Sequence, residues 1–118
     1  MGTSNLLQDI QGGKRADISL AASVNSDWLA WDVSGGSLSI RVTFHVADAE
    51  GTLGVQSYPG QAVAFLDENE DPQTTLAVTS ALDGLTHEFV ISAPCGRYRV
   101  TYTRASGGAA DTIDVAWS

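Results

Sequence analysis

The feature that most constrains the fold is a strict alternation of apolar and polar side chains from Leu38 to Val46. Leucine, isoleucine, valine, phenylalanine and valine occupy every second position, and serine, arginine, threonine and histidine stand between them. A β-strand turns successive side chains to opposite faces, so a period of two predicts a strand with one face on a core and one in water. Phe44 is expected on the buried face.

The same alternation recurs in Arg97–Arg104, where Tyr98, Val100 and Tyr102 share one face and Arg99 lies on the other. Weaker strands are predicted at Ala16–Ala22, Trp28–Val33, Thr52–Ser57, Ala62–Asp67, Thr74–Thr79, His87–Ser92 and Thr112–Trp117. Glycine- and proline-rich turns separate these segments. This pattern of short strands and turns predicts an all-β fold, an antiparallel sandwich of about eight to nine strands. Its strand order could be that of a jelly roll or of an immunoglobulin-like sandwich.

The chain of 118 residues is long enough for one domain. Residues 16–118 are expected to form the sandwich, and residues 1–15 a short N-terminal arm. Helical periodicity occurs only at Ser4–Ile10, where Leu6, Leu7 and Ile10 could form one apolar patch. Such a short helix needs a surface to dock on.

The charge balance narrows the range of partners. Six lysines and arginines against 14 acidic residues give a net charge of −8. Direct binding to nucleic acid and to anionic membranes is disfavoured, because both need clustered basic residues. The sequence shows neither an apolar run of the ~20 residues needed to insert into a membrane nor a secretory signal pattern. Its single cysteine, Cys95, excludes an intrachain disulfide and fits synthesis in a reducing cytoplasm.

Histidine and cysteine offer little for catalysis. His45 is expected on the wet face of its strand, His87 opens another strand, and Cys95 lies in a Pro-Cys-Gly turn. These three soft ligands have no recognisable metal spacing, and no known nucleophile or phosphate-binding motif occurs. The sequence therefore predicts a protein that is not an enzyme and needs no cofactor.

Acidic residues gather before Pro72, where Asp67, Glu68, Glu70 and Asp71 surround Asn69. Dense carboxylates can bind Ca²⁺, but the spacing of an EF-hand loop is missing. A solvated loop is the favoured interpretation, with a weak cation site as the alternative.

Three aromatic residues are candidates for contact with a partner. Trp28 and Trp31 are three positions apart, so a strand would turn them to opposite sides. Together with Tyr58 they could fill the core or a subunit contact, or stack on a sugar ring.

Two groups of segments carry a family resemblance. The first is 32–42 followed by Gly-Thr-Leu-Gly-Val-Gln-Ser at 51–57, and the second is 97–108 followed by the strand at 112–117. Both resemble small β-sandwich virion proteins of bacteriophages, in which a "Gly-Thr-Leu-x-Val-Gln-Ser" strand and an "Arg-x-x-Tyr-Thr-Arg-x-Ser-Gly" hairpin recur. The resemblance covers almost the whole domain. One departure is Tyr58-Pro59-Gly60-Gln61, where many such proteins have an Asn-Asp-Gly turn and then a tryptophan.

The resemblance implies a non-enzymatic virion structural protein, made in the cytoplasm of the bacterial host. It implies a capsid decoration or head- or vertex-associated protein, or a tail-associated one. Its partners would be the major capsid protein or other virion proteins, and it would be a homo-oligomer, a trimer or dimer. Leu6, Leu7, Ile10 and Arg99 are the candidate capsid or subunit contacts. The alternative is a carbohydrate- or receptor-binding module that stacks a glycan on Trp28, Trp31 or Tyr58.

Overall fold

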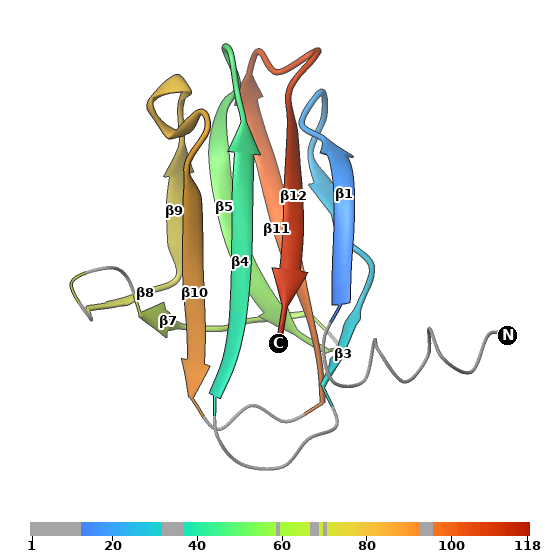
Figure 1. Cartoon of the computed structure of the whole chain (residues 1–118), viewed down its shortest axis with the longest axis vertical. Helices are drawn as coiled ribbons and strands as arrows, with labels where there is room; N and C mark the ends of the chain where they lie inside the picture. Colours follow the sequence, from blue (N-terminus) through green and yellow to red (C-terminus); the bar gives the residue numbers. More distant parts are fainter. Residues whose placement is uncertain (1–12, 32–36, 59, 67–68, 70, 93–95) are drawn as a thin grey trace, which may run out of the picture.

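The chain forms two antiparallel β-sheets packed face to face, which confirms the expected β-sandwich (Figure 1). The structure is a computed structural model, and it describes residues 13–31, 37–58, 60–66, 69, 71–92 and 96–118. Within these residues the helical content is one 3₁₀ turn, η1 (Ser80–Leu82). No helix in the described ranges has the length and apolar character needed to cross a membrane.

One sheet, called sheet A, holds the strand with the strictest alternation. Its strands lie in the order β1-β12-β4-β10-β7-β8. They comprise β1 (Gly13–Ser19), β12 (Thr112–Trp117), β4 (Ser37–His45), β10 (Thr86–Ser92), β7 (Phe65–Leu66) and β8 (Pro72–Gln73).

The opposing sheet, sheet B, is built around the second alternating segment. Its order is β2-β11-β5-β6, while β3 also pairs with β11 and β9 also pairs with β5. The strands are β2 (Val24–Asn25), β3 (Leu29–Trp31), β11 (Gly96–Ser106), β5 (Glu50–Ser57), β6 (Gln61–Ala62) and β9 (Thr75–Val78).

The strand order decides between the two predicted kinds of sandwich. If β2 and β3 count as one strand and the two-residue strands β6, β7 and β8 are set aside, sheet A holds the first, eighth, third and sixth strands. Sheet B holds the second, seventh, fourth and fifth. The first strand thus pairs with the last, which is jelly-roll order. An immunoglobulin-like sandwich would instead pair its first strand with its second.

All nine strands predicted from the sequence overlap observed strands. The expected strand Ala62–Asp67 is divided between β6 in one sheet and β7 in the other. The short strands β2 and β8 were not predicted, since two residues carry no periodicity. The first strand begins at Gly13, three residues before its expected start, because Gly13, Lys14 and Arg15 pair with β12. The predicted helix at Ser4–Ile10 lies outside the described residues.

The core lies between the sheets and contains the residues that the alternation predicted. Phe44 and its alternating partners in β4 are at most 2% exposed, and Tyr98, Val100 and Tyr102 of β11 are at most 5% exposed. Trp117 is buried at the end of β12. The outer face of sheet A is polar, and pairs such as the Thr43 and Thr86 hydroxyls, 2.9 Å apart, join its strands. Burial of one face per sheet is what a two-layer sandwich requires.

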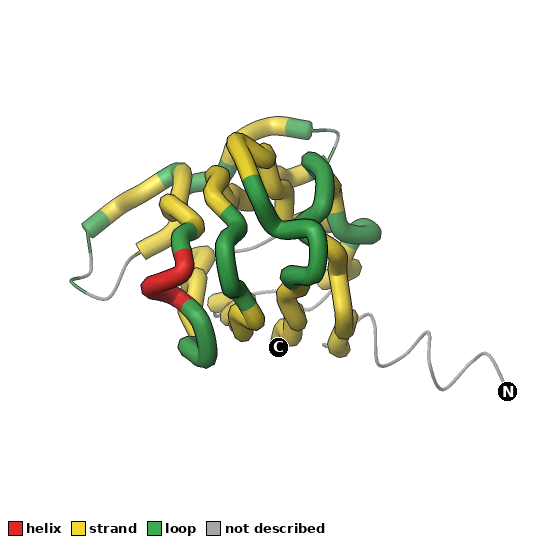
Figure 2. Tube along the Cα trace, turned by 90° about the horizontal axis from the view of Figure 1, so that it is seen from above, coloured by secondary structure: helices red, strands yellow, loops and turns green. Residues whose placement is uncertain are grey.

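One end of the sandwich is fixed by a buried carboxylate. Asp111, in the turn between β11 and β12, is 3% exposed and accepts the backbone N–H groups of Ala47, Asp48 and Ala49 at 2.8–3.0 Å. Figure 2 looks down on the loops at this end. Burial would raise the pKa of Asp111, but these N–H donors outweigh burial and the pKa lies below its ordinary value. An ionised Asp111 therefore ties the β4–β5 turn to the β11–β12 turn.

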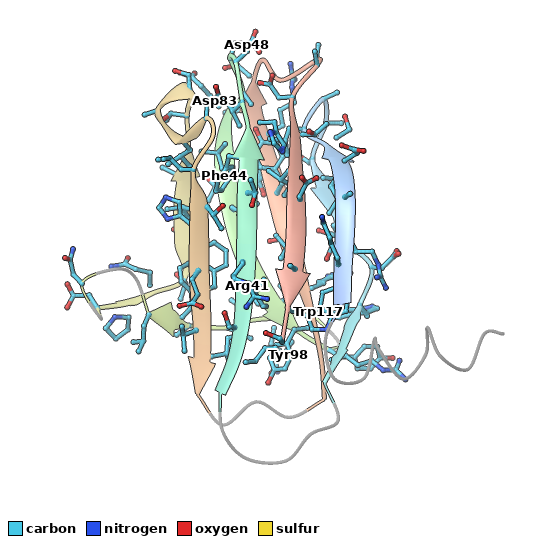
Figure 3. All side chains as sticks on the ribbon, viewed as in Figure 1. Arg41, Phe44, Asp48, Asp83, Tyr98 and Trp117 are labelled. Carbon is cyan, nitrogen blue, oxygen red and sulfur yellow. The ribbon has the colours of Figure 1, made fainter. Side chains whose placement is uncertain are left out.

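A second acidic residue reinforces the same end. The carboxylate of Asp83, which follows η1, accepts the N–H of Val46 at 2.9 Å, while Asp48 accepts the N–H of Gly108, also at 2.9 Å. Figure 3 shows Asp48 and Asp83 together at this end, with Phe44 farther along the sandwich. Several turns are thus held by side-chain acceptors, and not only by the strand ladders.

Candidate functional site

The outer face of sheet B brings together two aromatic rings, two guanidinium groups and an amide. Trp28 lies just before β3, Gln56 near the end of β5, Tyr58 just after β5, and Arg97 and Arg99 in β11. Arg99 is the direct cross-strand partner of Gln56, so both side chains extend from the same face of the sheet. These five residues are called the aromatic–arginine patch.

Arg99 is fixed in the patch by two contacts. Its Cζ atom lies 4.3 Å from the centre of the Trp28 ring, within the range of a cation–π interaction. Its Nε–H donates a 2.9 Å hydrogen bond to Oε1 of Gln56. The guanidinium plane is therefore oriented before any partner arrives.

Tyr58 and Arg97 are the exposed residues of the patch. Tyr58 is 59% exposed, and its ring centre lies 5.2 Å from that of Trp28 with an interplanar angle of 65°. The Cζ atom of Arg97 lies 5.8 Å from the Tyr58 ring centre. The backbone N–H of Tyr58 donates to the carbonyl of Arg97 at 2.9 Å, and this hydrogen bond ties the backbone of Tyr58 to β11.

The two arginines of the patch bring two positive charges to this face of sheet B. Within the described residues, no carboxylate forms an ion pair with Arg97 or Arg99. The nearby Asp27 instead approaches Arg15, with 3.7 Å between Nε and Oδ2. On a protein with a net charge of −8, these two guanidinium groups make a local positive site beside exposed aromatic surface.

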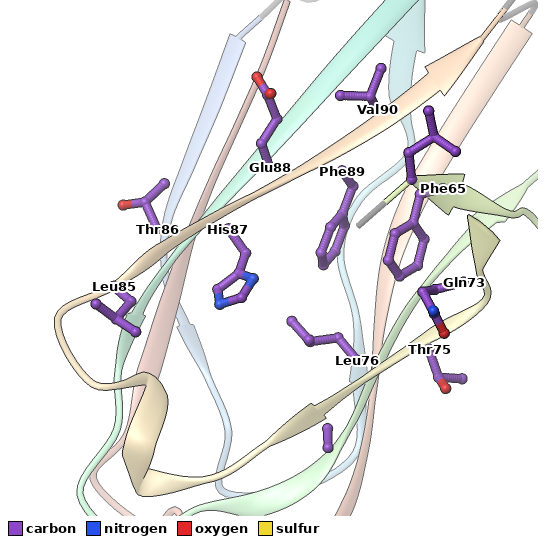
Figure 4. Close-up of a pocket in the computed structure, with 12 residues that line it drawn as sticks. Phe65, Gln73, Thr75, Leu76, Leu85, Thr86, His87, Glu88, Phe89 and Val90 are labelled. Carbon is purple, nitrogen blue, oxygen red and sulfur yellow. The ribbon is translucent and has the colours of Figure 1, made fainter. Parts of the chain in front are cut away.

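A groove of about 810 Å³ lies on another side of the molecule, between β9 and β10 (Figure 4). Its floor includes the stacked rings of Phe65 and Phe89, whose centres are 4.3 Å apart, and Leu76. His87 and Glu88 are among its polar lining residues. β9 pairs with β5 and β10 with β4, and no pairing among the described residues joins β9 to β10. The groove is therefore the open side of the sandwich.

The two histidines do not come together as a site. His45 is exposed on the outer face of sheet A, and its Nε2 lies 3.1 Å from Oδ2 of Asp114. His87 is half-buried and points inward, with its ring 5.8 Å from that of Phe44 in an edge-to-face arrangement. Asp114 also accepts the N–H of Asp17, which lowers the pKa of Asp114, and His45 lowers it further. Cys95 lies outside the described residues.

The weak cation site of the acidic run stays a prediction. Asp71 is exposed just before β8, while Asp67, Glu68 and Glu70 lie outside the described residues. In the ranges that the structure covers, no three acidic, histidine or cysteine residues gather closely enough to hold a metal ion.

Sequence reasoning identified three of the five residues in the patch. It named Trp28 and Tyr58 as glycan candidates and Arg99 as a contact candidate, and the structure places all three together. It missed Arg97 and Gln56. The alternation in β11 already places Arg97 on the same face as Arg99. Gln56 becomes a neighbour of Arg99 only through the register between β5 and β11. The side chain of Trp31 and the predicted contacts Leu6, Leu7 and Ile10 lie outside the described residues.

Comparisons of the chain with protein-family models, with curated proteins and with solved structures find no match.

Proposed function

We propose that this chain is a non-enzymatic structural protein of a bacteriophage virion, a capsid decoration or head- or vertex-associated protein that binds the particle surface. The observation that carries the proposal is the pairing of the segments that resemble phage virion proteins. The strand at 51–57 and the hairpin strand at 97–106 are neighbours in sheet B, in register from Tyr98↔Ser57 to Arg104↔Gly51. The two motifs thus form one structural unit.

The architecture supports a role on a particle surface. Jelly-roll sandwiches are common among viral capsid and lectin domains, although a shared fold by itself does not establish a shared function. The side-chain locks at Asp111 and Asp83 hold the turns at one end of the sandwich. A rigid scaffold of this kind suits a protein that must survive outside the cell.

Attachment through the N-terminal segment is part of the proposal. The first described strand begins at Gly13, which pairs with Trp117, and residues 1–12 precede the described part of the chain. Leu6, Leu7 and Ile10 supply the apolar side chains for docking on a capsid protein. Oligomers on a symmetric lattice would multiply such weak contacts into avidity.

The alternative is a carbohydrate- or receptor-binding module. It is favoured by one observation, the contact of an exposed aromatic ring, Tyr58, with a half-buried one, Trp28, on sheet B. Aromatic faces with an exposed polar rim are suited to stacking on sugar rings.

The test uses the purified full chain, a variant lacking residues 1–12, and phage particles that lack the protein. Light scattering gives the mass in solution, and co-sedimentation measures attachment. We expect a dimer or trimer that sediments with the particles, and a truncated variant that keeps its circular dichroism and melting temperature but loses attachment.

Two results would count against this proposal. A monomer that stays in the supernatant would remove the virion role in favour of the binding module. A truncated variant that attaches as well as the full chain would exclude the N-terminal segment as the anchor.

A further inference from the structure

We propose that the aromatic–arginine patch binds a carboxylate-bearing saccharide, such as a uronic acid or sialic acid unit of a surface glycan. This site is independent of particle attachment through the N-terminal segment. It would give the protein an adhesive function in addition to its structural one.

The aromatic half of the patch supplies the surface for the sugar ring. A pyranose has apolar C–H faces that pack against aromatic rings, and Tyr58 is exposed enough to offer one. Trp28 holds Tyr58 in an edge-to-face arrangement, so the ring is supported from the protein side.

The charged half supplies the recognition of the acid group. Arg99 uses its Nε–H to bind Gln56, and its terminal N–H groups make no hydrogen bond within the described residues. A guanidinium group presents paired N–H donors that match the two oxygens of a carboxylate. Arg97 lies two residues away on the same face and adds a second positive charge. The amide of Gln56 remains able to bind a sugar hydroxyl through its nitrogen.

The charge of the whole molecule selects a singly charged unit over a polyanion. With a net charge of −8, the protein repels nucleic acid and other dense polyphosphates over long range. Two local arginines can still compensate one carboxylate at short range. An oligosaccharide with one acid group combines the two features that the patch recognises, an apolar ring face and a separate carboxylate.

The orientation of Arg99 favours binding for a further reason. Its contacts with Trp28 and Gln56 restrict the side chain in the free protein. Less conformational entropy is then lost when a ligand binds. Replacing Arg99 by lysine would keep the charge but lose the planar stacking and the paired donors.

The experiment measures saccharide binding in the absence of particles. The full chain is titrated with sialyllactose and with the methyl glycoside of galacturonic acid, which each carry one carboxylate, and with lactose as the neutral sugar, by calorimetry and by tryptophan fluorescence. We expect both acidic sugars to bind, lactose to bind at least about tenfold more weakly, and added salt to reduce the difference.

Variants assign the binding to the patch. Arg99→Gln should weaken binding of the acidic sugars by about tenfold and leave lactose nearly unchanged, Arg99→Lys should lie between, and Tyr58→Ala should weaken all three sugars. Lys14→Gln, which removes one exposed positive charge on sheet A, is the matched control and should bind as the unchanged chain does. Melting temperatures confirm that each variant is folded.

Several outcomes would overturn the inference. Equal affinity for acidic and neutral sugars, or no measurable binding of either acidic probe at millimolar concentration, would do so. An equal loss in Lys14→Gln would show a non-specific charge effect. If no sugar binds but Arg99→Gln abolishes co-sedimentation with particles, the patch is a protein contact. Because the sugar titrations contain no particles, a failure to bind sugar would not affect the virion proposal. A failure to attach to particles would likewise not affect the sugar-binding proposal.

Discussion

At the residue scale, a few turn residues hold one end of the sandwich together. Asp111 has three backbone donors and almost no exposure, which is the environment of a structural carboxylate. Gly107 and Gly108 lie in the same corner and both have positive φ angles. None of these three residues belongs to an alternating pattern, so periodicity did not mark them.

Replacing Asp111 by alanine should destabilise the protein by at least about 2 kcal/mol, because three backbone N–H donors, one of them buried and two partly buried, would lose their acceptor. Urea unfolding of the variant measures the loss. Asp27→Ala removes an exposed carboxylate near Arg15 and serves as the control, with an expected change below about 0.5 kcal/mol. An equal loss in both variants would contradict the lock at Asp111.

The lowered pKa of Asp111 predicts that the free energy of unfolding depends on pH. The pKa of Asp111 is lowered in the folded protein, from an ordinary value of 3.8. Its contribution should therefore be complete above that ordinary value, and should be lost as the pH falls through the lower folded pKa. The pKa of Asp114 is also lowered, so Asp114 should contribute to the same loss of stability at acid pH. Urea midpoints measured across this range should fall less steeply with acid in Asp111→Asn than in the unchanged chain.

Gly107 and Gly84 allow backbone strain to be separated from crowding. Both have positive φ, +65° and +75°. A Cβ atom at Gly107 would collide with the carbonyl oxygen of Asp48, whereas nothing lies within 4 Å of one at Gly84. Gly84→Ala should cost about 1 kcal/mol from φ strain, and Gly107→Ala clearly more. Similar melting temperatures for the two variants would mean that the backbone around Gly107 shifts to accommodate a Cβ atom, which would contradict the predicted collision.

At the element scale, alternation fixed which face of each strand is buried. In β4 the apolar set faces sheet B and the polar set faces water. The register between strands then decided which outer side chains became neighbours. Arg99 meets Gln56 because β11 and β5 pair with that offset, and a shift of one residue would turn the charged set inward.

Phe44→Ala tests the assignment of faces in β4. The side chain is fully buried, so its truncation should cost about 3–5 kcal/mol. Thr43→Ala changes the neighbouring residue on the outer face and should cost within about 1 kcal/mol, from its hydroxyl contact with Thr86. Chemical unfolding of both variants gives the comparison. A loss larger for Thr43 than for Phe44 is incompatible with this orientation of β4.

At the scale of the whole molecule, function depends on surfaces made by distant segments. The patch joins residues from three segments of the chain, at 28, 56–58 and 97–99, that sheet B collects on one face. The groove is likewise made where β9 and β10 face each other without pairing (Figure 4). Charge is distributed at this scale too, since a strongly acidic protein carries two arginines together at the patch.

The sequence by itself determined the fold class, the positions of nine strands and the buried face of the two strongest ones. A period of two is a local property, and burial of one strand face follows from it wherever the strand lies. Strand order could not be determined in this way, because periodicity carries no information about which strand is the neighbour. Only the tertiary structure showed that β1 pairs with β12 and gives jelly-roll order, and that β5 and β11 place Gln56 beside Arg99. The patch depends on the pairing of β5 with β11, and this pairing between distant segments is determined by the packing of the whole core.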